Sequence, residues 1–240
     1  MELDETFGSE QVGSDERRRR IRRVFEAVAP RYDLMNDLMS FGIHRLWKRT
    51  MARHCSGVQD TVVDLAGGTG DVARLLAGKH GKVVVCDPGL AMMREGRRRA
   101  GAPLLWLAGE AEALPLRSGS IDLLTVAFGL RNATRLEAAL AEIHRVLRPG
   151  GRFVCLEFSR PHFWLRPFYD LYSYFVIPRL GAWVARQPIA YQYLVDSIRR
   201  FPDQASFAAA LQVAGFADVA WRNLSFGIAC LHFGTKPHEA

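Results

Sequence analysis

The feature that most constrains the fold is a glycine-rich turn directly after a buried apolar run. Thr61–Ala66 has the composition of a strand covered on both faces, and Gly67, Gly68, Thr69 and Gly70 follow it. A helix is expected near 71–79, so the turn joins a strand to a helix. The segment from Gly68 fits the G-x-G-x-x-G/A pattern, and Asp87 lies about 20 residues further on. This pattern predicts a nucleotide-binding βαβ unit.

Strands and helices continue to alternate after this unit. Further strands are expected at 82–86, 104–107, 121–128 and 152–158, and helices near 90–100 and 134–147. The C-terminal part predicts a helix at 204–214 and two antiparallel strands around 217–224 and 227–234. The expected fold is therefore an α/β, doubly wound, mostly parallel sheet with an antiparallel C-terminal strand. Ligands of such sheets bind at the carboxyl ends of the strands.

The N-terminal part follows a different pattern. Residues 1–16 hold six acidic residues and no basic one, without apolar periodicity, so we expect a disordered acidic tail. Apolar residues spaced i, i+3, i+4, i+7 from Ile21 predict a short amphipathic helix, with the arginines of 17–23 on its outer face. Residues 31–56 are expected to be helical, with a break at 40–42.

Charge and cysteine content limit the partners and the compartment. The 240 residues include 32 Lys and Arg against 25 Asp and Glu, a net charge of +7, which favours an anionic membrane surface or nucleic acid. We expect no nucleic-acid partner, because the bases concentrate at 17–23 and 94–99 and no Asn-Pro-Pro-Tyr-like motif follows the fourth strand. Four cysteines without paired spacing predict no metal site and no disulfide, and they fit a cytoplasmic protein. Neither a signal peptide nor a membrane-spanning helix is expected.

Acidic side chains around the glycine turn narrow the choice of nucleotide. Asp64 and Asp71 flank the turn, Asp87, Glu110 and Glu112 follow neighbouring strands, and the turn itself contains no Lys or Arg. Such a group would repel the pyrophosphate of a dinucleotide. It would suit S-adenosylmethionine, which has a ribose, an adenine and positive charge but no phosphate. Helix caps and solvated carboxylates are the alternative roles, and they explain one acid more easily than five.

Several segments resemble known methyltransferases. Asp64–Asp71 is similar to the first motif of class I S-adenosylmethionine-dependent methyltransferases. Residues from about 24 to 237 resemble the ubiquinone/menaquinone biosynthesis C-methyltransferases, through Tyr32–Asp37, Ser40–Lys48, Ala111–Pro115, Phe128–Asn132, Arg145–Gly151, Leu156–Ser159 and Tyr191–Pro202. The first of these segments, with its His-Arg-Leu-Trp-Lys continuation, and Phe-Gly-Leu-Arg-Asn are specific to this family.

The resemblance implies a Rossmann-like class I methyltransferase fold with S-adenosyl-L-methionine as cofactor. The cofactor site would comprise Asp64, Gly67, Gly68, Thr69 and Gly70 of the first motif, together with Asp87, Glu110, Ala111 and Ala127. Asp87 would bind the ribose, and Glu110 with Ala111 would meet the adenine. Ala127 stands where many members have a serine that contacts the cofactor, so that contact is lost or replaced.

The implied reaction is C-methylation of a polyprenylated hydroquinol ring, either a demethylmenaquinol or a 2-polyprenyl-6-methoxy-1,4-benzoquinol. Arg131 is expected to stabilise a phenolate or orient a water, because an arginine does not release its proton at neutral pH. Asn132 would hold a quinol oxygen, and Asp71 would anchor that water or the cofactor's amino acid moiety. Tyr32 and His44 are further catalytic candidates, and the pKa range of a histidine suits a base.

The expected domains are a tail (1–16), a helical lid (17–56) and a methyltransferase domain (57–237) with an aromatic-rich helical insertion at about 160–200. Between 163 and 183 this insertion carries eight of the 25 aromatic residues. It would line a tunnel for the lipid tail or touch the membrane peripherally at its inner face, whereas a homodimer interface or an ordinary helical core explains it equally well.

Two other functions stay open on the sequence. A methyltransferase of the same fold could act on another aromatic natural product, and a non-catalytic subunit of a quinone-biosynthesis complex could keep the same segments. An NAD-dependent oxidoreductase is disfavoured by the clustered acids and by the lack of a recognisable Tyr-x-x-x-Lys.

Overall fold

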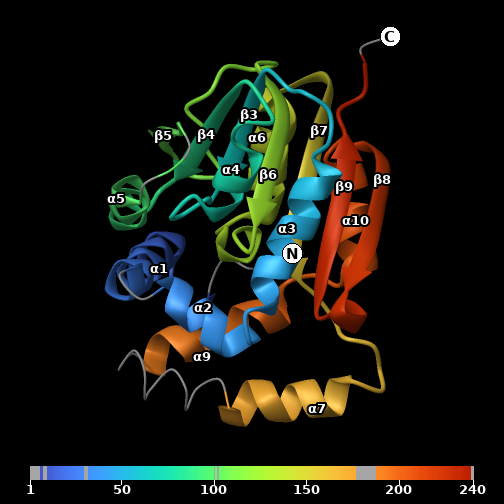
Figure 1. Cartoon of the computed structure of the whole chain (residues 1–240). Coiled ribbons are helices and arrows are strands. Elements are labelled where there is room, and N and C mark those ends of the chain that lie inside the picture. The colour runs from blue at the N-terminus through green and yellow to red at the C-terminus, as the bar shows by residue number, and fades with distance from the viewer. Residues whose placement is uncertain are drawn as a thin grey trace.

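The structure of the chain is a computed structural model that describes residues 6–7, 10–29, 32–99, 101, 103–176 and 188–238. Seven strands form one sheet in the order β5-β4-β3-β6-β7-β9-β8 (Figure 1). They are β3 Thr61–Leu65, β4 Lys82–Asp87, β5 Leu105–Ala108, β6 Ile121–Ala127, β7 Leu147–Phe158, β8 Ala217–Leu224 and β9 Ala229–Thr235. Strands β3 to β7 pair in parallel, and β9 lies antiparallel between β7 and β8. The expected fold class is confirmed.

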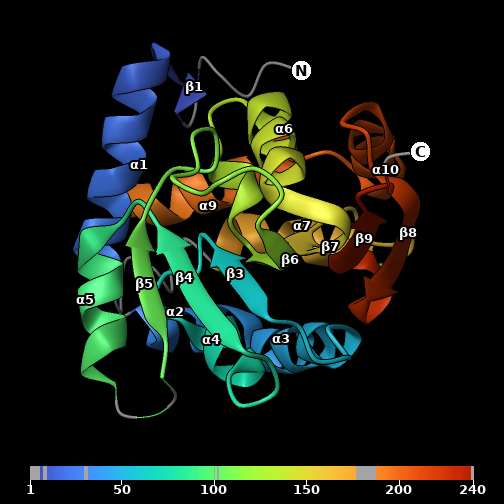
Figure 2. The same cartoon turned by 90° about the horizontal axis from the view of Figure 1, so that it is seen from above.

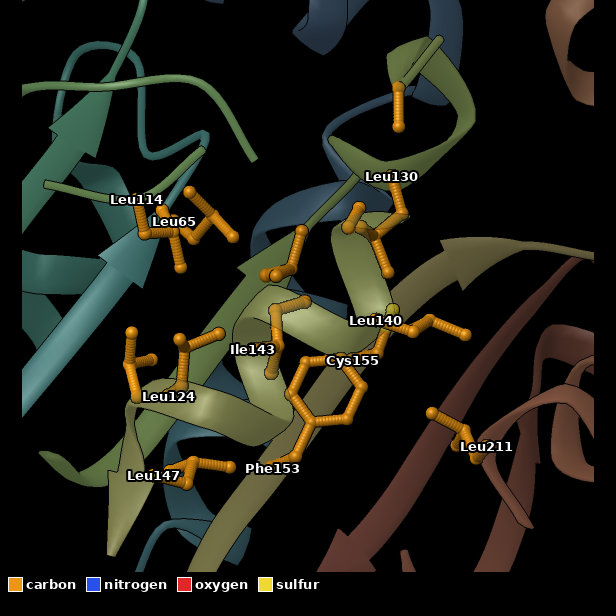
Figure 3. Close-up of a cluster of buried hydrophobic side chains, with 14 of the residues drawn as sticks. Leu65, Leu114, Leu124, Leu130, Leu140, Ile143, Leu147, Phe153, Cys155 and Leu211 are labelled. Atoms are coloured by element: carbon orange, nitrogen blue, oxygen red, sulfur yellow. The ribbon is translucent and has the colours of Figure 1, made fainter. Parts of the chain in front are cut away.

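Helices cover both faces of this sheet, as Figure 2 shows. They are α3 Ile43–His54, α4 Asp71–Leu76, α5 Leu90–Arg98, α6 Leu136–Val146 and α10 Gln204–Val213. Successive residues of a strand point to opposite faces, so Leu124 of β6 belongs to the apolar cluster that includes α6 and α10 (Figure 3), whereas Leu123 belongs to the cluster that includes α3 and α4. Burial on both faces explains why the central strands read as continuous apolar runs.

The N-terminal part is more ordered than expected. Two short strands, β1 Thr6–Phe7 and β2 Glu10–Gln11, pair antiparallel, and α1 covers Ser14–Val28. Asp15 and Glu16 begin this helix and bond to arginines three and four positions later, which stabilises the helix start where the sequence suggested a disordered tail. The boundaries of the tail, lid and domain stay predictions.

Arg17 corrects the expectation that the arginines all lie on the outer face of α1. Its side chain is only 3% exposed. It donates hydrogen bonds to the Ala133 carbonyl oxygen at 3.0 Å and to Thr134 Oγ1 at 3.5 Å, both in the loop after β6. Arg17 therefore docks α1 against the carboxyl end of the sheet.

The aromatic-rich insertion lies at this same end. It contains α7 Arg166–Leu171, a π-helix at Tyr172–Val176 and α9 Pro188–Arg200, while Trp183 lies outside the described residues. Tyr172 Oη donates to the Met39 carbonyl oxygen at 2.9 Å and so joins the insertion to α2, Tyr32–Ser40. In Figure 1, α2, α7 and α9 all lie below the strands of the sheet. None of the described helices is long and apolar enough to cross a membrane.

Candidate active site

Asp64, near the end of β3, stabilises the glycine turn between β3 and α4. A Cβ atom on Gly67 would lie 2.8 Å from Asp64 Oδ2, and Gly70 has a φ of +82°, so glycine is required at both positions. Asp64 accepts hydrogen bonds from the Ala73 amide at 3.1 Å and from Thr125 Oγ1 at 3.0 Å. Burial raises the pKa of Asp64 to about 7. Asp64 therefore shapes the turn and is absent from the described lining of the two cavities that adjoin this end of the sheet.

A first cavity opens beside this turn, with Asp87 on its wall. The Gly68 amide donates to Asp87 Oδ2 at 2.9 Å, and the Gly89 amide donates to Oδ1 at 2.6 Å. Burial raises the pKa of Asp87. Each carboxylate oxygen keeps a further lone pair, so the two oxygens can accept from the two hydroxyls of a ribose.

The rest of the first cavity suits a nucleoside base. Its apolar lining includes Leu65, Met92 and Ala111 together with Ile21 and Phe25 of α1. Helix α1 therefore covers the cavity.

The charges around the first cavity correct the sequence argument about clustered acids. Glu110 lines the cavity, but it forms ion pairs with Arg18 at 3.5 Å and with Arg22 at 3.2 Å. Glu112 accepts from the Thr134 amide at 2.6 Å. The acids are thus largely bonded within the protein, and the lining arginines are already paired with a carboxylate. Because the lining offers carboxylates and no unpaired cation among the residues named here, it fits a ribose and an adenine better than a pyrophosphate.

Asp71 lies away from both cavities described here. It accepts from Lys48 Nζ at 3.1 Å and pairs with Arg99 at 3.4 Å, and these cations lower its pKa despite its burial. Lys48 itself lines the second cavity. Asp71 therefore reaches that cavity only through Lys48, and the expected direct contact with water or cofactor stays a prediction. Gly67, Thr69 and Gly70 are likewise absent from the described lining of the first cavity.

A second, larger cavity adjoins the first at Phe128, which lines both. Its lining is mostly apolar and includes Leu165, Phe168, Tyr169 and Tyr172 of the insertion. Ala127 lies in this wall, whereas the sequence placed it at the cofactor. A flat apolar ring therefore fits here.

Arg131 places a buried positive charge in the second cavity. Its Nη1 donates to Glu157 Oε1 at 3.1 Å and to the Phe128 carbonyl oxygen, and its guanidinium lies 5.5 Å from the Phe158 ring centre. Arg131 Nε is buried and has no hydrogen-bond partner among the described residues. Burial raises the pKa of Glu157, and the charge of Arg131 opposes that rise. Glu157 thus orients Arg131, and the Nε–H group of Arg131 is left to donate a hydrogen bond to a ligand.

His44 lines the same cavity as a neutral acceptor. Ser40 Oγ donates its proton to the Asn36 carbonyl oxygen at 2.6 Å. Because that proton is used, Ser40 Oγ can only accept a hydrogen bond from His44 Nδ1, which lies 2.8 Å away. This arrangement favours the tautomer with the proton on Nδ1 and a lone pair on Nε2, and Nε2 is buried without a hydrogen-bond partner in the described part of the chain. Burial lowers the pKa of His44 to about 4.

Asn132 and Tyr32 complete the predicted set. Asn132 lines the first cavity, not the second, so the structure does not bring it to the expected quinol position. Its Oδ1 accepts from Tyr193 Oη at 3.0 Å. The side chain of Tyr32 lies outside the described residues. Among the described residues no group of three His, Cys, Asp or Glu side chains could hold a metal ion.

Comparison with known proteins decides the family. A sequence model of the ubiE/COQ5 methyltransferase family matches residues 11–236. The chain belongs to the ubiE/COQ5 methyltransferase family. It is 61% identical to the ubiquinone/menaquinone biosynthesis C-methyltransferase UbiE of Rubrivivax gelatinosus, covering 99% of this chain and 95% of that protein. The protein of the same name from Paracoccus denitrificans is 49% identical, with 96% of each chain covered.

Solved structures support the fold of this methyltransferase. A S-adenosylmethionine-dependent methyltransferase from Thermotoga maritima, described as a histamine N-methyltransferase candidate, superposes with a TM-score of 0.67 at 21% identity, covering 90% of this chain and 99% of the other. A methyltransferase from Haloferax volcanii, solved with its Trm112 activator, gives 0.66 at 21% identity, with 89% and 98% covered.

Two residues of this methyltransferase were missed as site residues from the sequence. Glu157 orients Arg131, and its only signal was its place in the family-like segment Leu156–Ser159. Lys48 links Asp71 to the second cavity, and it ends another such segment. Segment resemblance marks such positions, but it does not say which partner each one has.

The protonation of His44 can be measured directly. With its pKa near 4, His44 should stay neutral and carry its proton on Nδ1 from pH 8 to pH 5 in two-dimensional ¹H–¹⁵N spectra of the imidazole nitrogens. Because its pKa in the folded chain is below the unfolded value of 6.5, its stabilising contribution is complete above pH 6.5 and is lost toward pH 4. A proton on Nε2, or titration near pH 6.5, would contradict this assignment.

Proposed function

We propose that this methyltransferase uses S-adenosyl-L-methionine to methylate a ring carbon of a polyprenylated hydroquinol, demethylmenaquinol or the methoxy-benzoquinol or both. The observation that carries the proposal is the pair of adjoining cavities, one suited to a nucleoside and the other apolar with Arg131 and His44 in its wall. The names of its relatives, which are ubiquinone/menaquinone biosynthesis C-methyltransferases, support the same reaction.

The first cavity would hold the cofactor. Asp87 would accept hydrogen bonds from the ribose hydroxyls, while Met92, Ala111 and Phe25 would enclose the adenine. Gly68 permits a close approach to the turn because it has no side chain. When bound, S-adenosylmethionine supplies an electrophilic methyl group on a positively charged sulfur.

Arg131 would stabilise the electron-rich form of the substrate ring. Methylation forms a carbon–carbon bond, breaks a sulfur–carbon bond and releases one ring hydrogen as a proton. A ring carbon is a better nucleophile when a neighbouring hydroxyl oxygen carries more negative charge. The guanidinium is held by Glu157 in an apolar cavity, so its hydrogen bond to that oxygen acts in a low dielectric.

His44 would take the hydroxyl proton as the carbon–carbon bond forms and return it to that oxygen when the ring hydrogen leaves and the ring becomes aromatic again, so that one proton is released in all. A base with a pKa near 4 does not deprotonate a free phenol readily, but the hydroxyl becomes strongly acidic as the ring carbon gains its new bond. Nε2 of His44 then needs only to accept a hydrogen bond early and the proton late. The favoured Nδ1–H tautomer keeps this lone pair available without any rearrangement.

The aromatic insertion would bind the lipid tail. Phe168, Tyr169 and Tyr172 extend the second cavity beyond the ring site, and Phe168 is 69% exposed, so the cavity reaches the surface there. A polyprenylated substrate resides in a bilayer, and we therefore place the protein in the cytoplasm with a peripheral contact to the inner face of the membrane.

A methyl-transfer assay tests the proposed function. The purified chain is incubated with methyl-labelled S-adenosylmethionine and either a reduced demethylmenaquinol or a reduced demethylated benzoquinol, and the lipid is extracted. Label in one product names the ring class, and label in both means a tolerant cavity. No label in either product, with cofactor binding established by calorimetry, would refute the quinol substrate.

A further inference from the structure

A third cavity adjoins the second cavity, which is the proposed substrate cavity, and it differs from that cavity in having a charged and polar lining. It shares Tyr169 and Ile198 with the substrate cavity, so these side chains form the wall between the two. Its lining is rich in cations and hydroxyls: Arg160, Arg166, Arg199, Ser159 and Ser173. Asp170 is the one carboxylate among the described residues of this lining, against three arginines.

Internal pairing leaves this cavity positively charged. Asp170 accepts from Arg199 Nη2 at 2.9 Å, and Arg166 Nε lies 3.9 Å from its other oxygen. Arg160 lies 3.6 Å from Asp203, which is outside the described lining. Guanidinium groups match the oxygens of a phosphate in a fork geometry, and a phosphate would supply the missing negative charge.

Ser159 gives an independent indication of a ligand. Ser159 lines the third cavity and is only 8% exposed, and its buried hydroxyl has no hydrogen-bond partner among the described residues. A buried hydroxyl without a partner costs free energy, whereas a phosphate oxygen in the cavity could accept its proton. The Ser159 amide already donates to the Ile228 carbonyl oxygen, so the backbone position is fixed.

The surface beside this cavity carries exposed aromatic and aliphatic side chains that could insert into a lipid bilayer. Within and before α7, Phe163, Trp164, Phe168 and Leu171 are exposed, and Arg166 lies between them in the sequence. Phe41, at the end of α2, is 77% exposed, and its ring centre lies 6.0 Å from that of Tyr172. Aromatic side chains mixed with arginines are typical of segments that lie in a membrane interface.

We propose that the third cavity binds the headgroup phosphate of an anionic phospholipid. The lipid would hold the exposed side chains of α7 and α2 in the bilayer, so that the rim of the substrate cavity, formed by Phe41 and Phe168, faces the membrane. This inference rests on the proposed function in one respect, namely that the substrate is a quinol taken from a bilayer. It adds a phosphate site that the reaction itself does not require.

Vesicle cosedimentation of the full chain tests the proposal. The chain should partition onto vesicles of phosphatidylcholine mixed with phosphatidylglycerol much more than onto phosphatidylcholine alone. Arg160→Gln and Arg166→Gln should each weaken that partition about five-fold, and Ser159→Ala should weaken it further. Arg98→Gln and Arg117→Gln, each made singly, are the matched controls, because each removes one positive charge from an exposed position near the amino ends of the strands.

Four results would overturn the proposal. The first is that the control variants lose vesicle binding as much as the test variants do, and the second is that the chain binds both vesicle types equally. The third is that inorganic phosphate binds saturably at this cavity while the chain does not bind vesicles. The fourth is that the chain does not bind vesicles but forms a concentration-dependent dimer, which Phe168→Asp dissociates. Methyl transfer by the unaltered chain to a water-soluble short-chain quinol is measured separately, because it needs no vesicle. Its failure would refute the proposed function, whereas vesicle results alone bear on the phosphate site.

Discussion

Replacing Arg131 by methionine should abolish most methyl transfer and also destabilise the fold. The substitution leaves Glu157 buried without its countercharge, and losing one partner of a buried ion pair costs about 3–5 kcal/mol of the free energy of unfolding. Loss of a donor aimed at the developing charge lowers kcat about 10²- to 10³-fold. Denaturant unfolding and single-turnover methyl transfer measure the two effects separately.

A second substitution distinguishes the two effects. In the double variant Arg131→Met with Glu157→Gln the buried charge is gone, and we expect the cost in stability to fall to about 1–3 kcal/mol, that of imperfectly paired neutral groups. Activity should not recover. A double variant with nearly normal kcat would show that Arg131 has only a structural role. Arg148→Met is the matched control, because Arg148 pairs with the buried Asp122 away from both cavities, and it should leave kcat unchanged.

The cost of the single substitution should depend on pH. Burial holds the pKa of Glu157 above its ordinary value of 4.5, and removing Arg131 raises it further. The folded variant then binds a proton that the unfolded chain has released. The loss in stability relative to the natural chain should therefore be small near pH 4.5 and increase as the pH rises toward the raised pKa.

Asp87→Asn should raise the Kd for S-adenosylmethionine about 100-fold. An asparagine has a single acceptor oxygen, whereas Asp87 accepts from both the Gly68 and the Gly89 amides. One amide would lose its partner and the ribose would lose a charged acceptor, together worth about 2.7 kcal/mol. Titration calorimetry should find the same loss for S-adenosylhomocysteine, since the ribose is common to both.

A control separates binding from stability in this experiment. Asp122 is also a buried aspartate that accepts from a backbone amide, that of Thr61, but it lies at the amino end of β6. Asp122→Asn should destabilise the fold and leave the Kd nearly unchanged. A Kd for Asp87→Asn that matched this control would remove Asp87 from the ribose site.

Local patterns in the sequence were sufficient for the architecture. The apolar run before Gly67, the turn glycines and the alternation of strand and helix predicted β3, α4 and a mostly parallel sheet, because period and turn chemistry depend on near neighbours. The family resemblance implied a cofactor site of nine residues, and the described lining of the first cavity contains four of them: Gly68, Asp87, Glu110 and Ala111.

The partners of the charged groups were decided by the tertiary structure alone. Arg17 and Ala133 are 116 positions apart, and Arg131 and Glu157 are 26 apart, so no local period relates them. Ala127 and Asn132 are near neighbours in the chain but line different cavities. Between them the chain reverses at Phe128, with a φ of +58°, and at Gly129, where a Cβ would clash with Ala66. Such contacts depend on how segments that are distant in the chain pack together, and a local sequence pattern does not determine that packing.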